Sequence, residues 1–257
     1  MFNIPKKVSD RFVKQTLRFQ KILKNASDRD VNEADTVKIV ADMLADIFGF
    51  DKYTEITSEF AIRNTFCDLA IKVRDDVKYL IEVKAIGINL KENHLRQAVN
   101  YGANKGMKWV ALTNGLNWEF YNIRLDKSVQ YEKVFSFNFL DINPRKAEDK
   151  ELLFLICREG LNYAVIDEYH EKMQSLNRFV ISAILLNEST LNMIRREIRK
   201  LTPGLKVDTI EIENILRNEV LKREVFESET AIDAQKKVKK IYSKLTRKKK
   251  VVTNNQQ

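Results

Sequence analysis

Two strand-like segments carry carboxylates and a lysine at spacings that suit phosphate chemistry. One segment contains Asp68, and the next contains Glu82 followed, after one residue, by Lys84. Because side chains on a strand alternate between its two faces, Glu82 and Lys84 share a face. Asp68 joins them if the two strands pair through an odd-numbered loop, or through a bulge, near residues 74–77. With Asp68 opposite Glu82, the loop would be residues 74–76.

Two carboxylates and an ammonium on one patch suit the hydrolysis of a phosphodiester. That reaction needs an activated water in line with the leaving oxygen, and positive charge on the pentavalent phosphate. Mg²⁺ supplies both and prefers oxygen ligands, with Mn²⁺ as an alternative ion. Asp68, Glu82 and the main-chain carbonyl of Val83 can hold such an ion, and Lys84 can orient or deprotonate the water. The competing interpretation is an ordinary cross-strand ion pair on a solvated sheet face.

A third carboxylate stands at the head of a predicted helix. Glu33 lies four residues before Val37, at the start of an apolar stripe that continues through Val40, Leu44 and Ile47. Burying a lone carboxylate is costly, so Glu33 on this stripe makes sense if it faces a metal or a lysine. A glutamate in the first turn is also favoured by the helix dipole alone, and both interpretations stay open.

A polar pair lies on the helix predicted after the second strand. Gln97 and Tyr101 are four residues apart, so they share a helix face, and His94 lies on the same side. The simpler interpretation is a surface glutamine beside a half-buried tyrosine.

Hydrophobic periodicity predicts the elements that position these residues. Gly49 and Gly106 are placed to end helices, and Asn114-Gly115 is typical of a hairpin turn. The expected order is helices at 9–25 and 32–48, strands at 53–60, 66–73 and 77–85, a helix at 90–104, and strands at 108–113, 118–123 and 129–137.

From Pro144 onward the pattern is almost wholly helical, with a break at 202–204. Two domains are therefore expected: an α+β or α/β domain over 1–143, with a core at about 32–123 and a basic N-terminal helix, and an all-α domain over 144–257 with a basic C-terminal tail. The expected helices of the second domain are 147–160, 164–186, 189–201, 208–223 and 229–246.

The succession of these elements and residues resembles the PD-(D/E)XK nuclease superfamily. More narrowly, residues 32–123 are similar to the N-terminal nuclease domain of type I restriction enzyme R subunits. The matching segments are VNEADTVKIVADML with Glu33, FCDLAIKV with Asp68, YLIEVKA with Glu82 and Lys84, and LRQAVNYGANKG, which fits the Gln-x-x-x-Tyr signature of RecB-like nucleases.

The resemblance implies a restriction-endonuclease-like αβββαβ core with a mixed central sheet, and a metal-dependent cut in DNA. Asp68 and Glu82 would be metal ligands, Lys84 the catalytic lysine, and Gln97 and Tyr101 would place the substrate strand or the lysine. No G-x-x-x-x-G-K-[ST] motif occurs in these 257 residues, so we expect no P-loop translocase within them. We expect a Mg²⁺-dependent endodeoxyribonuclease of a restriction or phage-defence system. The alternative is a non-catalytic nucleic-acid-binding or oligomeric scaffold protein that keeps the nuclease fold.

The charge distribution bears on partners. The chain has 45 Lys and Arg against 36 Asp and Glu, and nine of the bases lie in residues 236–250, which contain no acid. The first 31 residues carry eight bases and three acids. Basic ends suit the phosphate backbone of DNA or RNA, although a solvated helix end explains the C-terminal run equally well. A wide apolar stripe over 163–186 favours packing against neighbouring helices, with the interface of a homodimer or larger homo-oligomer as the alternative. Proteins of a defence system are further candidate partners.

Cysteine, histidine and hydropathy exclude several classes. Cys67 and Cys157 are too few for a disulfide framework or a Cys-based zinc site, and their apolar neighbours predict that both are buried. The chain has only two histidines, which excludes most metal sites built from histidine. The longest apolar stretches, such as 179–186, are far shorter than the ~20 residues of a spanning helix, and the N-terminus lacks a signal-peptide pattern. The expected location is cytoplasmic.

Overall fold

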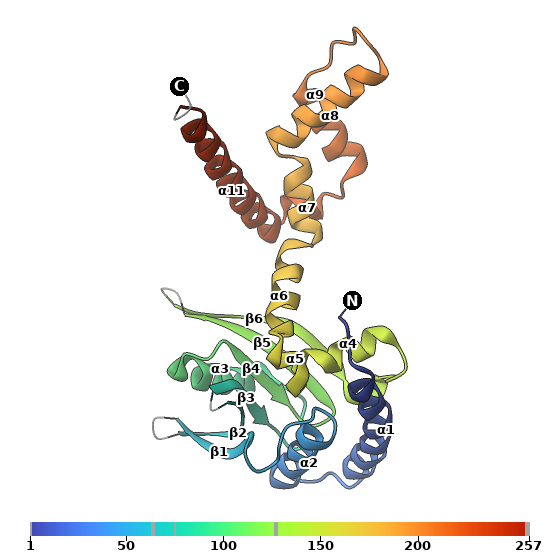
Figure 1. Cartoon of the computed structure of the whole chain (residues 1–257), viewed down its shortest axis with the longest axis vertical. Helices are drawn as coiled ribbons and strands as arrows, with labels where there is room; N and C mark the ends of the chain where they lie inside the picture. The colour runs from blue at the N-terminus through green and yellow to red at the C-terminus, as the bar shows by residue number, and fades with distance from the viewer. Residues whose placement is uncertain (1, 63–64, 75, 126–127, 255–257) are drawn as a thin grey trace. The chain divides into compact units, whose positions relative to one another are not determined.

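A mixed six-stranded sheet organises the first two thirds of the chain in a computed structural model, which describes residues 2–62, 65–74, 76–125 and 128–254 (Figure 1). The strands lie side by side in chain order. Only β3 and β4 are parallel; the other neighbours are antiparallel. The strands are β1 (Ile56–Ile62), β2 (Thr65–Val73), β3 (Asp76–Val83), β4 (Trp109–Thr113), β5 (Asn117–Leu125) and β6 (Val129–Asn138).

Helices cover both faces of this sheet. The crossover helix α3 (Glu92–Lys105) joins the parallel pair, as a parallel connection requires, and packs with Leu80 and Val110 in the smaller core. The opposite face belongs to the larger core, in which Ile71 and Ile81 meet α1 (Lys6–Asp28), α2 (Glu33–Asp46) and α4 (Ala147–Ile156). Alternate residues of β2 and β3 enter different cores, so both strands are apolar on their two faces over much of their length.

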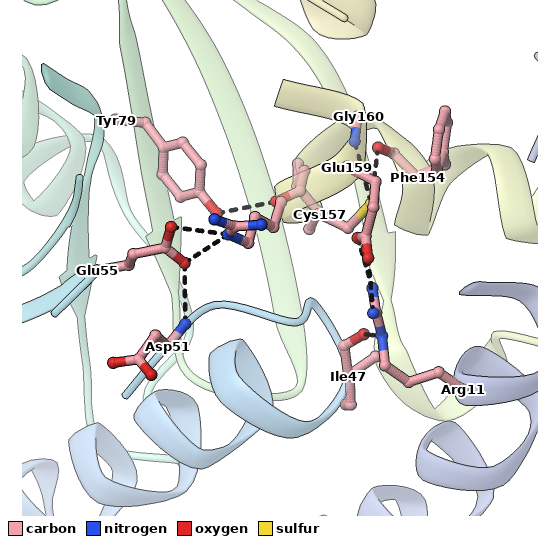
Figure 2. Close-up of polar contacts among 11 residues, drawn as sticks. Arg11, Ile47, Asp51, Glu55, Tyr79, Phe154, Cys157, Glu159 and Gly160 are labelled. Atoms are coloured by element: carbon pink, nitrogen blue, oxygen red, sulfur yellow. Dashed lines mark hydrogen bonds and ion pairs between the residues drawn. The ribbon is translucent and has the colours of Figure 1, made fainter. Parts of the chain in front are cut away.

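Polar contacts, most of them partly buried, tie the chain after the sheet to the sheet and to the chain before it (Figure 2). Arg11 of α1 donates to Glu159 at 2.8 and 2.7 Å and to the Ile47 carbonyl at 2.8 Å. The hydroxyl of Tyr79 on β3 donates to the Ile156 carbonyl at 3.0 Å. The guanidinium of Arg158 donates to both carboxylate oxygens of Glu55, at 2.7 and 2.8 Å. These contacts place the segment after β6 inside the first unit.

Internal contacts divide the chain into two units, Met1–His170 and Glu171–Gln257. Composition alone indicates a boundary near residue 143. The first unit extends further because α4 and α5 (Arg158–Asn162) belong to its core: Leu153, Leu155 and Cys157 are fully buried there. Both cysteines are buried and free, as predicted.

The second unit is helical, as predicted, with a small core of Ala183, Ala234 and Val238 packed by Phe179, Val180 and Tyr242. The single helix predicted at 164–186 is wrong: it is two helices, because Asn177 accepts the main-chain N–H groups of Phe179 and Val180 and starts a new one. The elements from there on are α6 (Val165–Ser175), α7 (Arg178–Leu185), α8 (Glu188–Leu201), α9 (Thr209–Ile215), the π-helical turn η2 (Leu216–Val220), α10 (Glu224–Glu227) and α11 (Glu229–Asn254).

The predicted fold class is confirmed, with small shifts at element ends. The strand predicted at 53–60 begins at Ile56, and the helix predicted at 147–160 is divided at Cys157, whose sulfur accepts the Gly160 N–H. A short 3₁₀ turn, η1 (Phe139–Asp141), follows β6. Gly49 and Gly106 adopt φ of 80° and 67° after their helices, the left-handed region that glycine favours. Among the described residues, no helix has the length and apolar character needed to cross a membrane.

Candidate active site

The pairing of β2 with β3 brings the two predicted carboxylates to the same level. Leu69 pairs with Ile81, so one step further along this antiparallel ladder sets Asp68 opposite Glu82. The register shifts between Ile71 and Lys72, which is the bulge that the sequence left open. The alternative loop over 74–76 does not form, because Asp76 is already paired with Val73; residue 75 lies outside the described residues.

The carboxylate of Asp68 is fixed by the main chain of β3. Its Oδ2 accepts the N–H of Val83 at 2.7 Å. Burial raises the pKa of Asp68 above its usual value, and this effect outweighs the lowering by the Val83 hydrogen bond and by Lys84. The group is therefore oriented by the main chain of the neighbouring strand.

Glu82 is the most unusual group of the site, because it is a charged side chain at 1% exposure. Its Oε1 accepts from the Lys84 ammonium at 2.8 Å, whereas its buried Oε2 has no hydrogen-bond partner among the described residues. Burial, together with the negative charge of Asp68, raises the pKa of Glu82 to about 7. Buried oxygens are nearly always paired in native proteins, so this orphaned oxygen calls for a ligand.

Lys84 links the carboxylates of the sheet to α2. Its side chain is 12% exposed, and its ammonium lies 3.6 Å from Oε2 of Glu33 as well as 2.8 Å from Glu82. Burial lowers the pKa of Lys84, but the hydrogen bond and charge of Glu82, followed by the charge of Glu33, outweigh it and raise the pKa. The side chain of Glu33 is half-exposed in the first turn of α2, so the structure brings it to the lysine, and the dipole of that turn also favours it.

The helix α3 carries the other predicted residues. Gln97 donates to the Tyr101 hydroxyl at 2.9 Å, and Tyr101 is packed in the smaller core on the sheet face of Asp68 and Glu82. Within the described part of the chain, no hydrogen bond or ion pair joins Gln97 or Tyr101 to the carboxylates or to Lys84. His94 closes the first turn of α3 by accepting the N–H of Lys91 at 3.3 Å. Nearby Lys84 contributes, after burial, to lowering the pKa of His94, so this histidine is near the lysine.

Sequence analysis missed the residue that holds the loop after Lys84. Asn114 is 3% exposed, and its Nδ2 donates to the carbonyls of Ile86 and Ile88 at 3.1 and 2.9 Å. Its Oδ1 accepts the N–H groups of Leu116 and Asn117 at 3.1 and 2.7 Å. One side chain thus satisfies four main-chain groups and joins two loops. The Asn-Gly dipeptide was a signal for a turn, but not for this longer-range contact.

The donor set fits a hard divalent cation. Among the described residues, no cluster of three or more His, Cys, Asp or Glu side chains could hold a metal. Two carboxylates, Asp68 and Glu82, remain, with the Val83 carbonyl between their strands. Mg²⁺ binds through one or two carboxylates and keeps several waters, so two carboxylates suffice for it. The unpaired Oε2 of Glu82 supplies a buried oxygen with free capacity.

The fold is α+β, with a mixed six-stranded sheet followed by helices, and is consistent with a nuclease-like domain. In the comparisons with known proteins, residues 40–137 match the family model for the N terminus of type I restriction enzyme R proteins. This match confirms the resemblance predicted from the sequence; it includes Asp68, Glu82, Lys84, Gln97 and Tyr101 but not Glu33. No curated protein and no solved structure matches the chain. This region is therefore similar to a nuclease domain of restriction systems.

Proposed function

We propose that this protein is a metal-dependent nuclease that hydrolyses DNA phosphodiester bonds in a restriction or phage-defence system. The observation that carries the proposal is the buried Glu82 carboxylate, with one oxygen on Lys84 and the other unpaired, beside Asp68. A structural ion pair would not need an unpaired buried oxygen, since such a group costs free energy without return.

Each group has a distinct part in the proposed reaction. Asp68 and Glu82, with the Val83 carbonyl, would hold the cation. When bound, Mg²⁺ supplies a water of lowered pKa and positive charge on the phosphate. The Lys84 ammonium, held between Glu82 and Glu33, neutralises charge that develops on the phosphoryl oxygens and orients the water. Gln97 and Tyr101 would contact the substrate strand from α3.

The test is nicking of supercoiled plasmid by the full chain with Mg²⁺, with Mn²⁺ and with EDTA. Wild type should cut only with a divalent cation, and Asp68→Asn should lose cleavage while it still binds DNA, because removing a carboxylate reduces repulsion of phosphate. An asparagine substitution at an exposed position, Asp10→Asn in α1, is the control for purity and folding. Cleavage that continues in EDTA would contradict the proposal. Binding without cleavage in both metals would favour the alternative, a non-catalytic nucleic-acid-binding protein.

A further inference from the structure

A pocket lies on the sheet face that carries Asp68 and Glu82, apart from these two carboxylates. Its volume is about 450 Å³, within the range of small-ligand sites. It is formed where the loop after β3 approaches the start of β5 and the end of β6. Its lining includes Asn89, Leu90, Asn117, Glu119, Ser136 and Asn138.

The sheet register connects this pocket to the candidate active site. Glu82 pairs with Leu112, Leu112 with Glu119, and Glu119 with Ser136. Residues that pair across strands point to the same face, so these side chains form one row that continues from Asp68. Neighbouring strands are about 4.8 Å apart, which puts Glu119 roughly 10 Å and Ser136 roughly 14 Å from Glu82. The pocket is therefore within reach of the same nucleic-acid strand.

Apart from the carboxylate of Glu119, the polar side chains of the pocket are neutral donors and acceptors. Asn138 donates to the Oδ1 of Asn117 at 3.0 Å, which leaves the Asn117 NH₂ group available. Within the described residues, the amide of Asn89 and the hydroxyl of Ser136 have no hydrogen-bond partner. A carboxamide offers both a donor and an acceptor, the pattern that reads the edge of a base, and Leu90 adds an apolar wall.

The charge of the pocket disfavours a phosphate. None of its described lining residues is a lysine or an arginine. The carboxylate of Glu119 is held by Lys133 at 2.7 Å and by the hydroxyl of Tyr121 at 2.5 Å, so it is compensated but gives no attraction to an anion. A neutral, flat, hydrogen-bonding group fits this lining better than a charged one.

The loop between Lys84 and the pocket is anchored by Asn114. Lys84 begins it and Asn89 and Leu90 lie near its end, while Asn114 holds the carbonyls of Ile86 and Ile88 between them.

We propose that this pocket holds an unpaired nucleobase of the strand whose phosphate lies at Glu82 and Lys84. This inference rests on the proposed function and deepens it: the enzyme needs a base at a fixed distance from the cut. Asn89, Asn117 and Ser136 are the residues that contact the base, and they would set any preference among bases.

Ser136→Phe is the main test variant, because Ser136 is exposed and phenylalanine is favoured in strands, so the change fills the pocket without disturbing the core. Ser128→Phe is its matched control, an exposed serine before the other end of the same strand. Asn89→Ala removes a single amide from the pocket. Equal melting temperatures confirm that the variants fold.

The first measurement is missing-base interference on a single-stranded DNA that contains random abasic nucleotides, cut with Mg²⁺. In wild type and Ser128→Phe, cleavage should fall about tenfold when the base a fixed few nucleotides from the cut is missing. In Ser136→Phe this dependence should disappear, and in Asn89→Ala it should weaken. Interference that is absent in wild type, or unchanged in Ser136→Phe, would overturn the inference while cleavage itself upholds the proposed function.

The second measurement separates the two proposals. In EDTA, wild type and Ser128→Phe should bind a strand that carries bases about tenfold more tightly than an abasic strand, and Ser136→Phe should not. If no metal supports cleavage but this preference appears, the proposed hydrolysis fails and the base pocket stands. If the preference is missing, the pocket proposal fails whatever the cleavage result.

Discussion

Replacing Glu82 by glutamine should abolish cleavage and yet make the metal-free protein more stable at alkaline pH. The pKa of Glu82 is raised from its usual 4.5 to about 7 by burial and by the charge of Asp68. A raised carboxyl pKa means that the folded state holds the proton more tightly than the unfolded state. Its contribution to stability is therefore lost as pH rises from 4.5, and the loss is complete above the folded pKa of about 7.

The size of the effect follows from that interval. At about 1.4 kcal/mol per pH unit, ionised Glu82 costs roughly 3 kcal/mol, a figure that already includes its attraction to Lys84. Glu82→Gln should thus be more stable than wild type by about 1–3 kcal/mol near pH 8.5, and by less than about 1 kcal/mol near pH 5. The glutamine keeps the shape of the side chain and an acceptor for Lys84.

Urea unfolding followed by tryptophan fluorescence is the assay. Both tryptophans, Trp109 and Trp118, are buried in the first unit, so the signal reports the unit that contains the site. Glu148→Gln, at an exposed position in the first turn of α4, is the control and should show no pH-dependent gain. A Glu82→Gln protein that is less stable than wild type near pH 8.5, measured in EDTA, would refute the argument that this carboxylate is retained for its ligand.

Three further outcomes are expected. Lys84→Met and Lys84→Arg should each reduce cleavage at least about a hundredfold. Methionine removes the positive charge, and the planar guanidinium of arginine differs in shape and keeps its proton, so normal cutting by Lys84→Arg would mean that the lysine acts only through its positive charge. If the C-terminal run binds phosphate, replacing the exposed Lys237 and Lys240 by glutamine should weaken the salt dependence of DNA binding. The slope of the logarithm of the binding constant against log salt should become shallower by about 1.8 on duplex DNA, and an unchanged slope would mean that the run is a solvated helix. Arg11→Gln should destabilise the first unit by about 1–2 kcal/mol at neutral pH. Burial raises the pKa of Glu159, but hydrogen bonds led by Arg11 outweigh it and lower the pKa below 4.5. The part of the loss that comes from Glu159 should therefore shrink progressively as pH falls from 4.5 through the lowered pKa, as melting curves against pH would reveal, while the part from the Ile47 carbonyl remains.

The point substitutions in the C-terminal run replace a deletion for a structural reason. Removing residues 236–257 would also remove Val238, which is 5% exposed in the small core of the second unit. A deletion would therefore mix a loss of folding with a loss of charge. The exposed lysines of α11 can be changed without that ambiguity.

Alternation along two strands was enough to predict which side chains share a face with Glu82, because this property is local. The bulge between Ile71 and Lys72 could be named only as one of two options, since register depends on both strands at once. The Asn114 contacts and the burial of α4 and α5 join residues far apart in sequence, and periodicity carries no signal for such contacts. The break at Asn177 was visible in principle, because asparagine is a favoured N-cap, but the apolar stripe masked it.

The single parallel contact in the sheet has a consequence for how the molecule assembles. Strands β1 to β3 and strands β4 to β6 are two antiparallel sets whose neighbours follow directly in the chain, and hairpins of this kind form within microseconds. The contact between β3 and β4 joins residues as far apart as Leu80 and Val110, with α3 between them, so its loop closure is the slower step. Glu82 lies on one side of this seam and Glu119 on the other. The row of side chains from Glu82 to Ser136 is therefore completed only when the two halves of the sheet come together. Substitutions at the contact between β3 and β4 should slow refolding more than substitutions within either half.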